Sequence, residues 1–272
     1  MFKLLLTIKS YLRILRFSSW KCRKLIPQVG NDITLKILGN GKSLVEIDLS
    51  TKDKVEYMVV NRHVLADNYV EIKPKYYVLA DPFFFTHPDG KNILKEIDDK
   101  TSWDMILFVP YNKKAQYSGW FSNPKISVTC YNATSFNGFT QIAYRLYDKK
   151  LAMPAVQNVL VACIMLGVYM KFCRVELYGV EHNWLKNLYV GDDNLVYLLN
   201  EHFYDKEKVL PRPQKEIQNL DEYPLYLNIL HYSRMFQSYW EISQYVKNRN
   251  LDIKIINCTK GSYIDAFERK IV

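Results

Sequence analysis

The sequence predicts an α/β protein with a Rossmann-like, mostly parallel sheet that carries helices on both faces. Short, nearly continuous apolar runs alternate with helical patterns, which is typical of strands buried on both sides. These runs end in Pro, Gly or a polar residue, as strands do. With 272 residues and an apolar fraction of 49%, the chain can bury a large core.

We expect one α/β domain over residues 30–272, and no internal repeat or low-complexity tract divides it. The expected strands are Thr34–Leu38, Glu56–Asn61, Lys75–Ala80, Asp104–Val109, Lys125–Cys130, Cys173–Tyr178 and Leu251–Asn257. Pro154 opens a long apolar helix over Ala155–Tyr169, and Leu225–Arg249 forms a second. The polar stretch 205–223, which holds two prolines, indicates a lid-like excursion.

The first expected strand ends in the turn Gly39-Asn40-Gly41-Lys42-Ser43. Glycine imposes no Cβ restriction, so this backbone can press close to a ligand. Ser43 is expected to cap a following helix, whose free N–H groups would bind an anion such as a nucleotide phosphate. A tight turn without a ligand fits these residues equally well, because they form neither Gly-x-Gly-x-x-Gly nor a Walker loop.

The net charge of +9 is concentrated at the N-terminus. Residues 1–25 carry seven bases and no acid, whereas the rest of the chain holds 30 bases and 28 acids. A nearly neutral remainder argues against a nucleic-acid-binding surface.

The basic segment has the pattern of an amphipathic helix. Leu5, Ile8, Leu12 and Leu15 share one face, and basic residues occupy most of the other. A charge every three or four residues excludes a membrane span, and no signal-peptide pattern is present. We therefore expect residues 1–25 to lie on an anionic membrane surface, with the protein peripheral on the cytoplasmic face. A helix docked on its own domain, or a basic arm for another partner, fits the same pattern.

The five cysteines are scattered, odd in number and without metal-binding spacing. They indicate small core residues in a reducing, cytoplasmic setting, without structural zinc. Two acidic pairs, Asp98-Asp99 and Asp192-Asp193, have the pattern of solvated turns. We therefore expect no metal site.

Polar residues follow several of the expected strands. Beyond the Gly39–Ser43 turn these are Asn61, Asp81 and the run Gly179-Val-Glu181-His182-Asn183. Since parallel sheets bind ligands at the carboxyl ends of their strands, we expect these residues to share one site.

These motifs resemble the bacterial lipooligosaccharide sialyltransferases, glycosyltransferase family 42. Gly39-Asn-Gly-Lys-Ser-Leu44 is similar to the family's Gly-Asn-Gly-Pro-Ser-Leu, and Val59-Val-Asn61 to its next strand end. Ala80-Asp81-Pro82 resembles a third strand end, where the family carries Asn-Pro. Residues 154–167 resemble its long helix, and Gly179-Val-Glu-His resembles its Gly-Ile-Asp segment. Related proteins of polysaccharide loci share the frame, with Pro-x-x-x-Asn-Val, here Pro154 to Val159, before the helix. The resemblance covers about residues 34–265 and overlaps a wider nucleotide-binding group that includes a pyrophosphokinase.

The resemblance implies roles for individual residues. Those expected at the donor nucleotide are Gly39, Asn40, Gly41, Lys42, Ser43, Asn61, Asp81, Asn158, Gly179, Glu181 and Tyr189. Lys42 stands where the family has Pro, Asp81 where it has Asn, and only the second of two phosphate-binding tyrosines, Tyr189, has a counterpart. The nucleotide and sugar of the donor therefore stay open among CMP, UDP, GDP and dTDP.

The implied chemistry is direct displacement at an anomeric carbon, with a histidine as the base. His202 best matches the position of the family's catalytic histidine, and His182, beside Glu181, is the rival. The chain is thus expected to be an inverting, metal-independent glycosyltransferase without cofactor. It would move sugar from a nucleotide donor to a glycan or lipid-linked acceptor in surface-polysaccharide synthesis, as a monomer or an oligomer. A phosphoryl or pyrophosphoryl transferase and a non-catalytic sugar-nucleotide-binding module are the alternatives.

Overall fold

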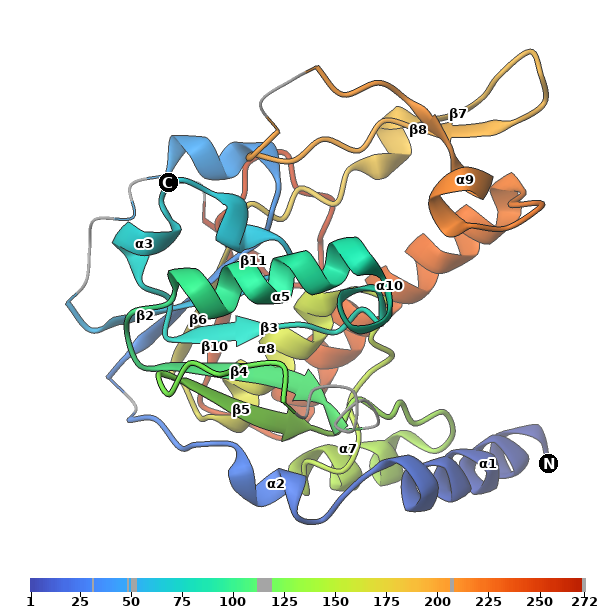
Figure 1. The fold of residues 1–272 in the computed structure, drawn as a ribbon. Helices are drawn as coiled ribbons and strands as arrows, with labels where there is room; N and C mark the ends of the chain where they lie inside the picture. The colour runs from blue at the N-terminus through green and yellow to red at the C-terminus, as the bar shows by residue number, and fades with distance from the viewer. Residues whose placement is uncertain (31, 48, 50–52, 112–118, 206–207, 271–272) are drawn as a thin grey trace.

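The computed structural model describes the whole chain except residues 31, 48, 50–52, 112–118, 206–207 and 271–272. Its centre is an eight-stranded, fully parallel sheet of order β11-β10-β6-β1-β2-β3-β4-β5 (Figure 1). In chain order its strands are β1 (Thr34–Leu38), β2 (Val55–Val60), β3 (Tyr76–Val78), β4 (Met105–Pro110), β5 (Ile126–Tyr131), β6 (Arg174–Tyr178), β10 (Lys254–Asn257) and β11 (Glu268–Arg269). The predicted α/β class with a parallel sheet is confirmed.

The strand order reverses once, between β1 and β6. The chain builds the sheet outward from β1 to β5 and then returns to place β6 on the other side of β1. Leu38 is therefore aligned with Val59 of β2 on one side and with Tyr178 of β6 on the other. In open parallel sheets such a switch point forms a crevice at the carboxyl ends of the strands.

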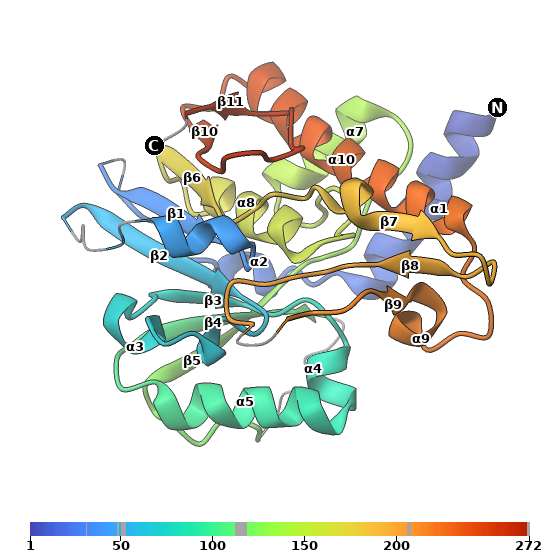
Figure 2. The ribbon, with the colours of Figure 1, turned by 90° about the horizontal axis from the view of Figure 1, so that it is seen from above.

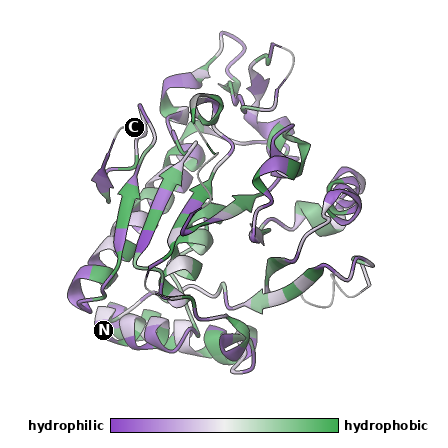
Figure 3. Ribbon diagram, turned by 90° about the vertical axis from the view of Figure 1, so that its left-hand side faces the viewer, coloured by the Kyte–Doolittle hydropathy of each residue, from purple (hydrophilic) through white to green (hydrophobic). Residues whose placement is uncertain are grey.

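Alternate residues of the central strands enter two separate cores. Ile37, Val60 and Val78 pack in one core, whereas Leu38 and Val59 pack in the other. The first core is covered by α7 (Thr140–Asp148), α8 (Val159–Tyr169) and α10 (Leu225–Asn248), and the second by α3 (Tyr69–Ile72), α4 (Phe83–Thr86) and α5 (Pro88–Lys100). Figure 2 shows the sheet between α5 and the layer formed by α7, α8 and α10. In Figure 3 the main-sheet strands other than β11 carry much green, because each of them contributes apolar residues to both cores.

Helix α8 starts four residues later than expected. All eleven of its residues are buried, which explains why the sequence there is apolar all round. Asn158 has an extended backbone and caps the helix by accepting a hydrogen bond from the Leu160 N–H at 2.9 Å, while residues 155–157 are not helical. The predicted start at Ala155 is therefore wrong.

The expected last strand is also shorter than predicted, since β10 begins at Lys254 and β11 follows it. Of the five cysteines, Cys173 is half-buried, the other four are buried, and all are free thiols.

A small antiparallel sheet lies above the carboxyl edge of the main sheet (Figure 1). It consists of β7 (Leu188–Val190), β8 (Val196–Leu198) and β9 (Arg212–Pro213), followed by α9 (Gln214–Gln218). The excursion expected over residues 205–223 thus belongs to a larger unit that starts near residue 188.

The N-terminal segment forms two helices rather than one, α1 (Phe2–Phe17) and α2 (Cys22–Leu25). The backbone becomes extended at Ser18, whose N–H still donates to the Ile14 carbonyl. Among the described residues, no helix is both long enough and apolar enough to cross a membrane.

Candidate active site at the carboxyl edge of the sheet

A pocket of about 330 Å³ lies at the switch point between β1 and β6. Its walls come from the ends of β1, β2 and β6, the start of α8 and the chain after β8. The lining residues are Gly39–Lys42, Val60, Asn61, Asn158–Leu160, Gly179, Glu181–Trp184, Asn187 and Leu199–His202. Most of the residues expected at the donor therefore do share one site.

The glycine turn closes against the end of β6. The Gly39 and Gly41 N–H groups donate to the carbonyls of Tyr178 and Gly179, which extends the strand ladder into the turn. A Cβ on Gly39 would lie 2.2 Å from the Gly179 oxygen, so only glycine fits. The turn is therefore fixed by backbone contacts on both sides.

The carboxylate of Glu181 occupies the position expected for an anion at this turn. It accepts a hydrogen bond from the Ser43 N–H at 2.7 Å, and a Cβ on Gly41 would lie 1.4 Å from Glu181 Oε2. The chain forms only a 3-10 helix, η1 (Lys42–Glu46), and its N-cap is Gly41. The expectation that Ser43 caps a helix with free N–H groups is thus wrong, because Glu181 already uses one of those groups.

Asn40 and Asn61 carry buried, unpartnered side-chain oxygens at the ends of β1 and β2. The Asn40 side-chain N–H donates to the Val60 carbonyl at 3.4 Å, and Asn61 adopts a left-handed backbone with φ of 54°. Among the described residues, neither Asn40 Oδ1 nor Asn61 Oδ1 has a hydrogen-bond partner, although both are buried. Such oxygens suit a ligand that donates hydrogen bonds, such as a ribose or a base.

His182 lines the pocket from a buried position. Its ring stacks on Trp184 with a centroid distance of 4.5 Å, and its Nδ1 lies 3.3 Å from the Tyr239 hydroxyl. Burial lowers the pKa of His182 from 6.5 to about 3, since little water is available to solvate the cation. The imidazole is therefore neutral and a poor proton acceptor near pH 7.

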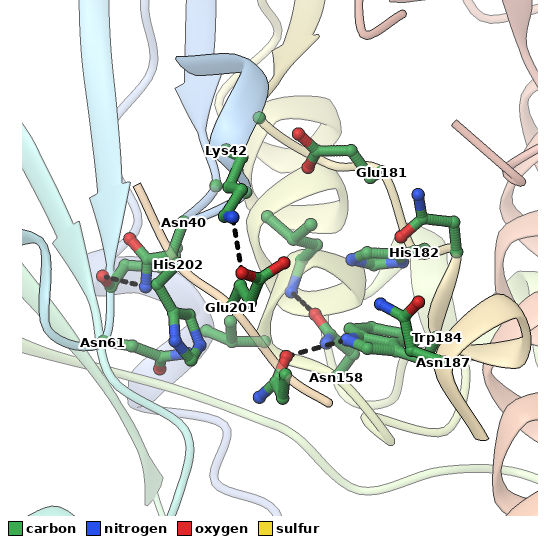
Figure 4. A pocket seen from close by; sticks show the side chains of 18 of the residues that line it. Asn40, Lys42, Asn61, Asn158, Glu181, His182, Trp184, Asn187, Glu201 and His202 are labelled. Carbon is green, nitrogen blue, oxygen red and sulfur yellow. Dashed lines mark hydrogen bonds and ion pairs between the residues drawn. The ribbon is translucent and has the colours of Figure 1, made fainter. Parts of the chain in front are cut away.

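His202 lies on the other side of the pocket, as Figure 4 shows, in the chain that follows β8. The Phe203 N–H donates to the Asn40 carbonyl at 3.1 Å, which holds this chain against the glycine turn. Asp205 accepts from the His202 backbone N–H, and its Oδ2 lies 3.6 Å from the ring Nδ1. Burial lowers the pKa of His202, while the Asp205 carboxylate acts in the opposite direction. A histidine so placed can accept a proton and keep it beside a carboxylate.

An ion pair connects the glycine turn with the chain that follows β8. Lys42 Nζ lies 2.5 Å from Glu201 Oε1, and Figure 4 shows the pair between His202 and Glu181. The Lys42 side chain is 59% exposed, so the pair is solvated and can separate when an anionic ligand enters.

Three expected residues do not line the pocket. Asp81 is exposed, three residues beyond the end of β3, and caps the Phe83 N–H at 2.9 Å. Tyr189 is 48% exposed on β7, where it stacks on Tyr197. Ser43 lies just behind the lining, with a buried hydroxyl that lacks a partner among the described residues.

The sequence interpretation missed the aromatic wall of the pocket. Trp184 lies between His182 and Tyr232, and its indole N–H donates to Asn200 Oδ1 at 3.1 Å. Asn187 also lines this wall. A tryptophan two residues after a strand-end histidine was the available signal, since aromatic faces commonly pack on sugars or bases.

The described part of the chain contains no group of three or more His, Cys, Asp or Glu that could hold a metal ion. Asp193 belongs to the β7–β8 turn, where its carboxylate accepts from the Tyr197 hydroxyl and the Leu195 N–H. This agrees with the solvated turn expected there. The same expectation for Asp98-Asp99 is wrong, because both residues lie in α5, where the Asp98 carboxylate accepts from the Ser122 and Asn123 N–H groups.

No model of a known protein family matches the sequence, and no curated protein matches it. Similar solved structures are sialyltransferases of Campylobacter jejuni. CstII in complex with the substrate analogue cytidine-5′-monophosphate has a TM-score of 0.47 and 13% identity, over 89% of this chain and 86% of that chain. An α-2,3-sialyltransferase in apo form has a TM-score of 0.46 and 11% identity, over 90% and 83%. The monofunctional α-2,3-sialyltransferase Cst-I has a TM-score of 0.46 and 13% identity, over 90% and 82%.

Proposed function

We propose that the protein is an inverting glycosyltransferase that uses a nucleotide-sugar donor. The observation that supports this most directly is the composition of the switch-point pocket. It combines unpartnered oxygens of Asn40 and Asn61 on one wall with a histidine beside a carboxylate, His202 and Asp205. The amide oxygens suit the hydroxyls and amines of a nucleoside, and the histidine suits removal of a proton from an acceptor hydroxyl.

In the proposed donor complex the nucleoside lies over the ends of β1 and β2. Asn40 and Asn61 accept hydrogen bonds from it, and Glu181, with its second oxygen, can accept from a ribose hydroxyl. The phosphate lies beside Lys42, the cation of the pocket lining, because the Glu181 carboxylate fills the turn itself. A diphosphate-linked donor would gain most from this lysine.

The proposed reaction is a single displacement. His202 takes the proton of the acceptor hydroxyl as its oxygen forms a bond to the anomeric carbon, and the bond from that carbon to the phosphate oxygen breaks. The anomeric configuration inverts, and the nucleotide leaves with the bonding electron pair. Asp205 stabilises the imidazolium, while Lys42 balances the charge of the leaving group without a metal. The acceptor is a glycan or a lipid-linked saccharide of a surface polysaccharide.

A thermal-shift screen with CMP-, UDP-, GDP- and dTDP-sugars, each with and without Mg²⁺, tests this proposal. We expect one nucleotide sugar to raise Tm without Mg²⁺, and His202→Gln to keep that shift but lose sugar transfer. Stabilisation by ATP with Mg²⁺, and by no nucleotide sugar, would favour the phosphoryl or pyrophosphoryl transferase instead. Transfer activity that survives in both His202→Gln and His182→Gln would contradict a histidine base.

A further inference from the structure

Helix α1 docks on the domain through two polar residues and one isoleucine, while most of its aliphatic residues stay exposed. Thr7, Ser10 and Ile14 are its buried residues, and they lie on one side of the helix. The Ser10 hydroxyl donates to the Asn137 carbonyl at 2.8 Å and accepts from the Asn137 N–H at 2.9 Å. The Phe139 N–H donates to the Thr7 hydroxyl at 3.1 Å. These contacts fix the rotation of the helix about its axis.

With this rotation the leucine face points into solvent. A helical wheel places five aliphatic residues on one face, turned away from the docking side, and each is 49–68% exposed. They are Leu4, Leu5, Ile8, Leu12 and Leu15. The expectation of an amphipathic helix in this segment was thus right, and docking on its own domain does not use the apolar face. A contiguous apolar surface of this kind usually marks an interaction site.

A basic sector adjoins this leucine face. At 100° per residue, Lys9, Arg13 and Arg16 lie between the leucine face and the docking side. No acidic residue occurs in residues 1–25, so nothing in this segment offsets their charge. Apolar side chains beside a strip of lysine and arginine match an anionic bilayer, whose acyl region takes the leucines and whose headgroups take the cations.

We propose that the leucine face of α1 binds the surface of an anionic phospholipid bilayer and anchors the protein there as a peripheral membrane protein. This inference goes beyond the proposed enzymatic function and does not depend on it. A protein partner would need acidic groups that match the same strip, and a second copy of this chain would bring two strips of like charge together. The lipid surface is therefore the occupant that the charge favours.

The location of α1 connects this surface with the pocket. Arg13 lines a second cavity, of about 260 Å³, with residues that follow β3 and β5, with Pro110 at the end of β4 and with the segment before α8. Gln157 lines this cavity, and its neighbour Asn158 lines the main pocket. In Figure 1 the N-terminal end of α1 lies on the side toward which β3, β4 and β5 point. A bilayer under the leucine face would thus lie beside the carboxyl edge of the sheet.

Co-sedimentation of the full chain with vesicles tests the proposal, with phosphatidylglycerol–phosphatidylcholine vesicles compared against pure phosphatidylcholine. We expect binding to the anionic vesicles that weakens with salt. The double variant Leu5→Glu/Leu12→Glu should bind on the order of 30-fold more weakly, because two leucines leave the interface. Lys9→Gln/Arg16→Gln should lose about 30-fold on anionic vesicles, at about 1 kcal/mol for each base.

Val70→Glu is the matched control, because Val70 is 46% exposed on α3, on the opposite side of the molecule from the N-terminus in Figure 1. It should bind vesicles like the wild type. Circular dichroism and Tm of each variant report folding separately. The proposal fails if the folded wild type ignores anionic vesicles, or if Leu5→Glu/Leu12→Glu binds them unchanged. It also fails if the wild type does not bind vesicles and light scattering shows instead that it is a dimer, with Leu5→Glu/Leu12→Glu monomeric.

Discussion

Two histidines line one pocket from opposite walls, and their surroundings differ. His182 belongs to the wall built by β6, where its ring is buried against Trp184 and Tyr239. His202 belongs to the wall formed by residues 199–205. Its ring Nδ1 lies 3.6 Å from the Asp205 carboxylate, and a third of the His202 side chain is exposed. The comparison teaches that a histidine beside the ligand is not sufficient for general-base catalysis. The protonated histidine must also be stabilised by its surroundings.

The largest expected effect is on kcat, and it should distinguish His202 from His182. His202→Gln should lower kcat about 10²- to 10⁴-fold at nearly constant donor affinity, since a general base contributes that much. His182→Asn should retain most of kcat, and Asn tolerates the left-handed backbone that His182 adopts at φ of 47°. Steady-state kinetics and donor titration distinguish the variants. Equal losses of kcat in His202→Gln and His182→Asn would contradict the assignment of His202 alone as the base.

The second effect is a pH dependence of stability that comes from the buried wall. The pKa of His182 is about 3 in the native protein and about 6.5 when unfolded. Below pH 6.5 His182 binds a proton in the unfolded chain but stays neutral in the native state. The free energy of unfolding therefore falls as the pH falls toward 3. Between pH 7 and pH 5, the protonation of His182 in the unfolded chain should lower the free energy of unfolding by about 2 kcal/mol.

Urea denaturation of the wild type and His182→Asn at both pH values measures this term. The variant should lose about 2 kcal/mol less than the wild type between pH 7 and pH 5. An equal loss in the two proteins would mean that His182 is charged or solvated in the native state.

A third, smaller effect tests the carboxylate in the turn. Gly41→Ala places a methyl group 1.4 Å from Glu181 Oε2, so the carboxylate must leave the Ser43 N–H. Loss of this charge-assisted hydrogen bond should cost about 1.5 kcal/mol and weaken donor binding. Gly30→Ala is the control, because its new Cβ would meet only Asp32 Oδ1, at 3.3 Å. Unchanged stability and donor affinity in Gly41→Ala would show that Glu181 does not fill the turn.

The smallest expected effect concerns the ion pair between Lys42 of the glycine turn and Glu201 of the wall that carries His202. Lys42→Met should lower the free energy of unfolding by less than about 1 kcal/mol, because the pair is exposed to solvent. It should nevertheless raise KM for the donor, since the phosphate loses its cation. Glu201→Gln frees Lys42 and should not raise KM. If both substitutions raise KM alike, the pair acts by positioning residues 199–205 rather than by binding phosphate.

The sequence predicted the core strands well because their residues are buried on both faces. Thr34–Leu38 is reproduced as β1, and the four strands that follow it start and end within two residues of expectation. Burial in two cores requires continuous apolar runs, which local sequence shows directly. Helices α5 and α7 were not predicted, although Ile93, Leu94 and Ile97 have helical spacing in α5.

The site was predictable where it follows strand ends and not where it depends on long-range folding. Asn40, Asn61 and Glu181 converge because parallel strands end at one edge. Asp81 does not, because its carboxylate caps the neighbouring turn at Phe83. The antiparallel unit from residue 188 contains two short strands around Gly191–Asn194, and no local pattern showed that it brings His202 back over the pocket.

The hydrogen bond between the Ser43 N–H and Glu181 joins residues 138 positions apart in the chain. Its two ends are brought together only after β6 has been inserted beside β1, a pairing of high contact order that forms slowly. During synthesis the first five strands can assemble before β6 exists, and an intermediate of that kind lacks the floor of the pocket. The proposed donor binding would therefore report completed folding, because a donor present during refolding would stabilise only the finished sheet.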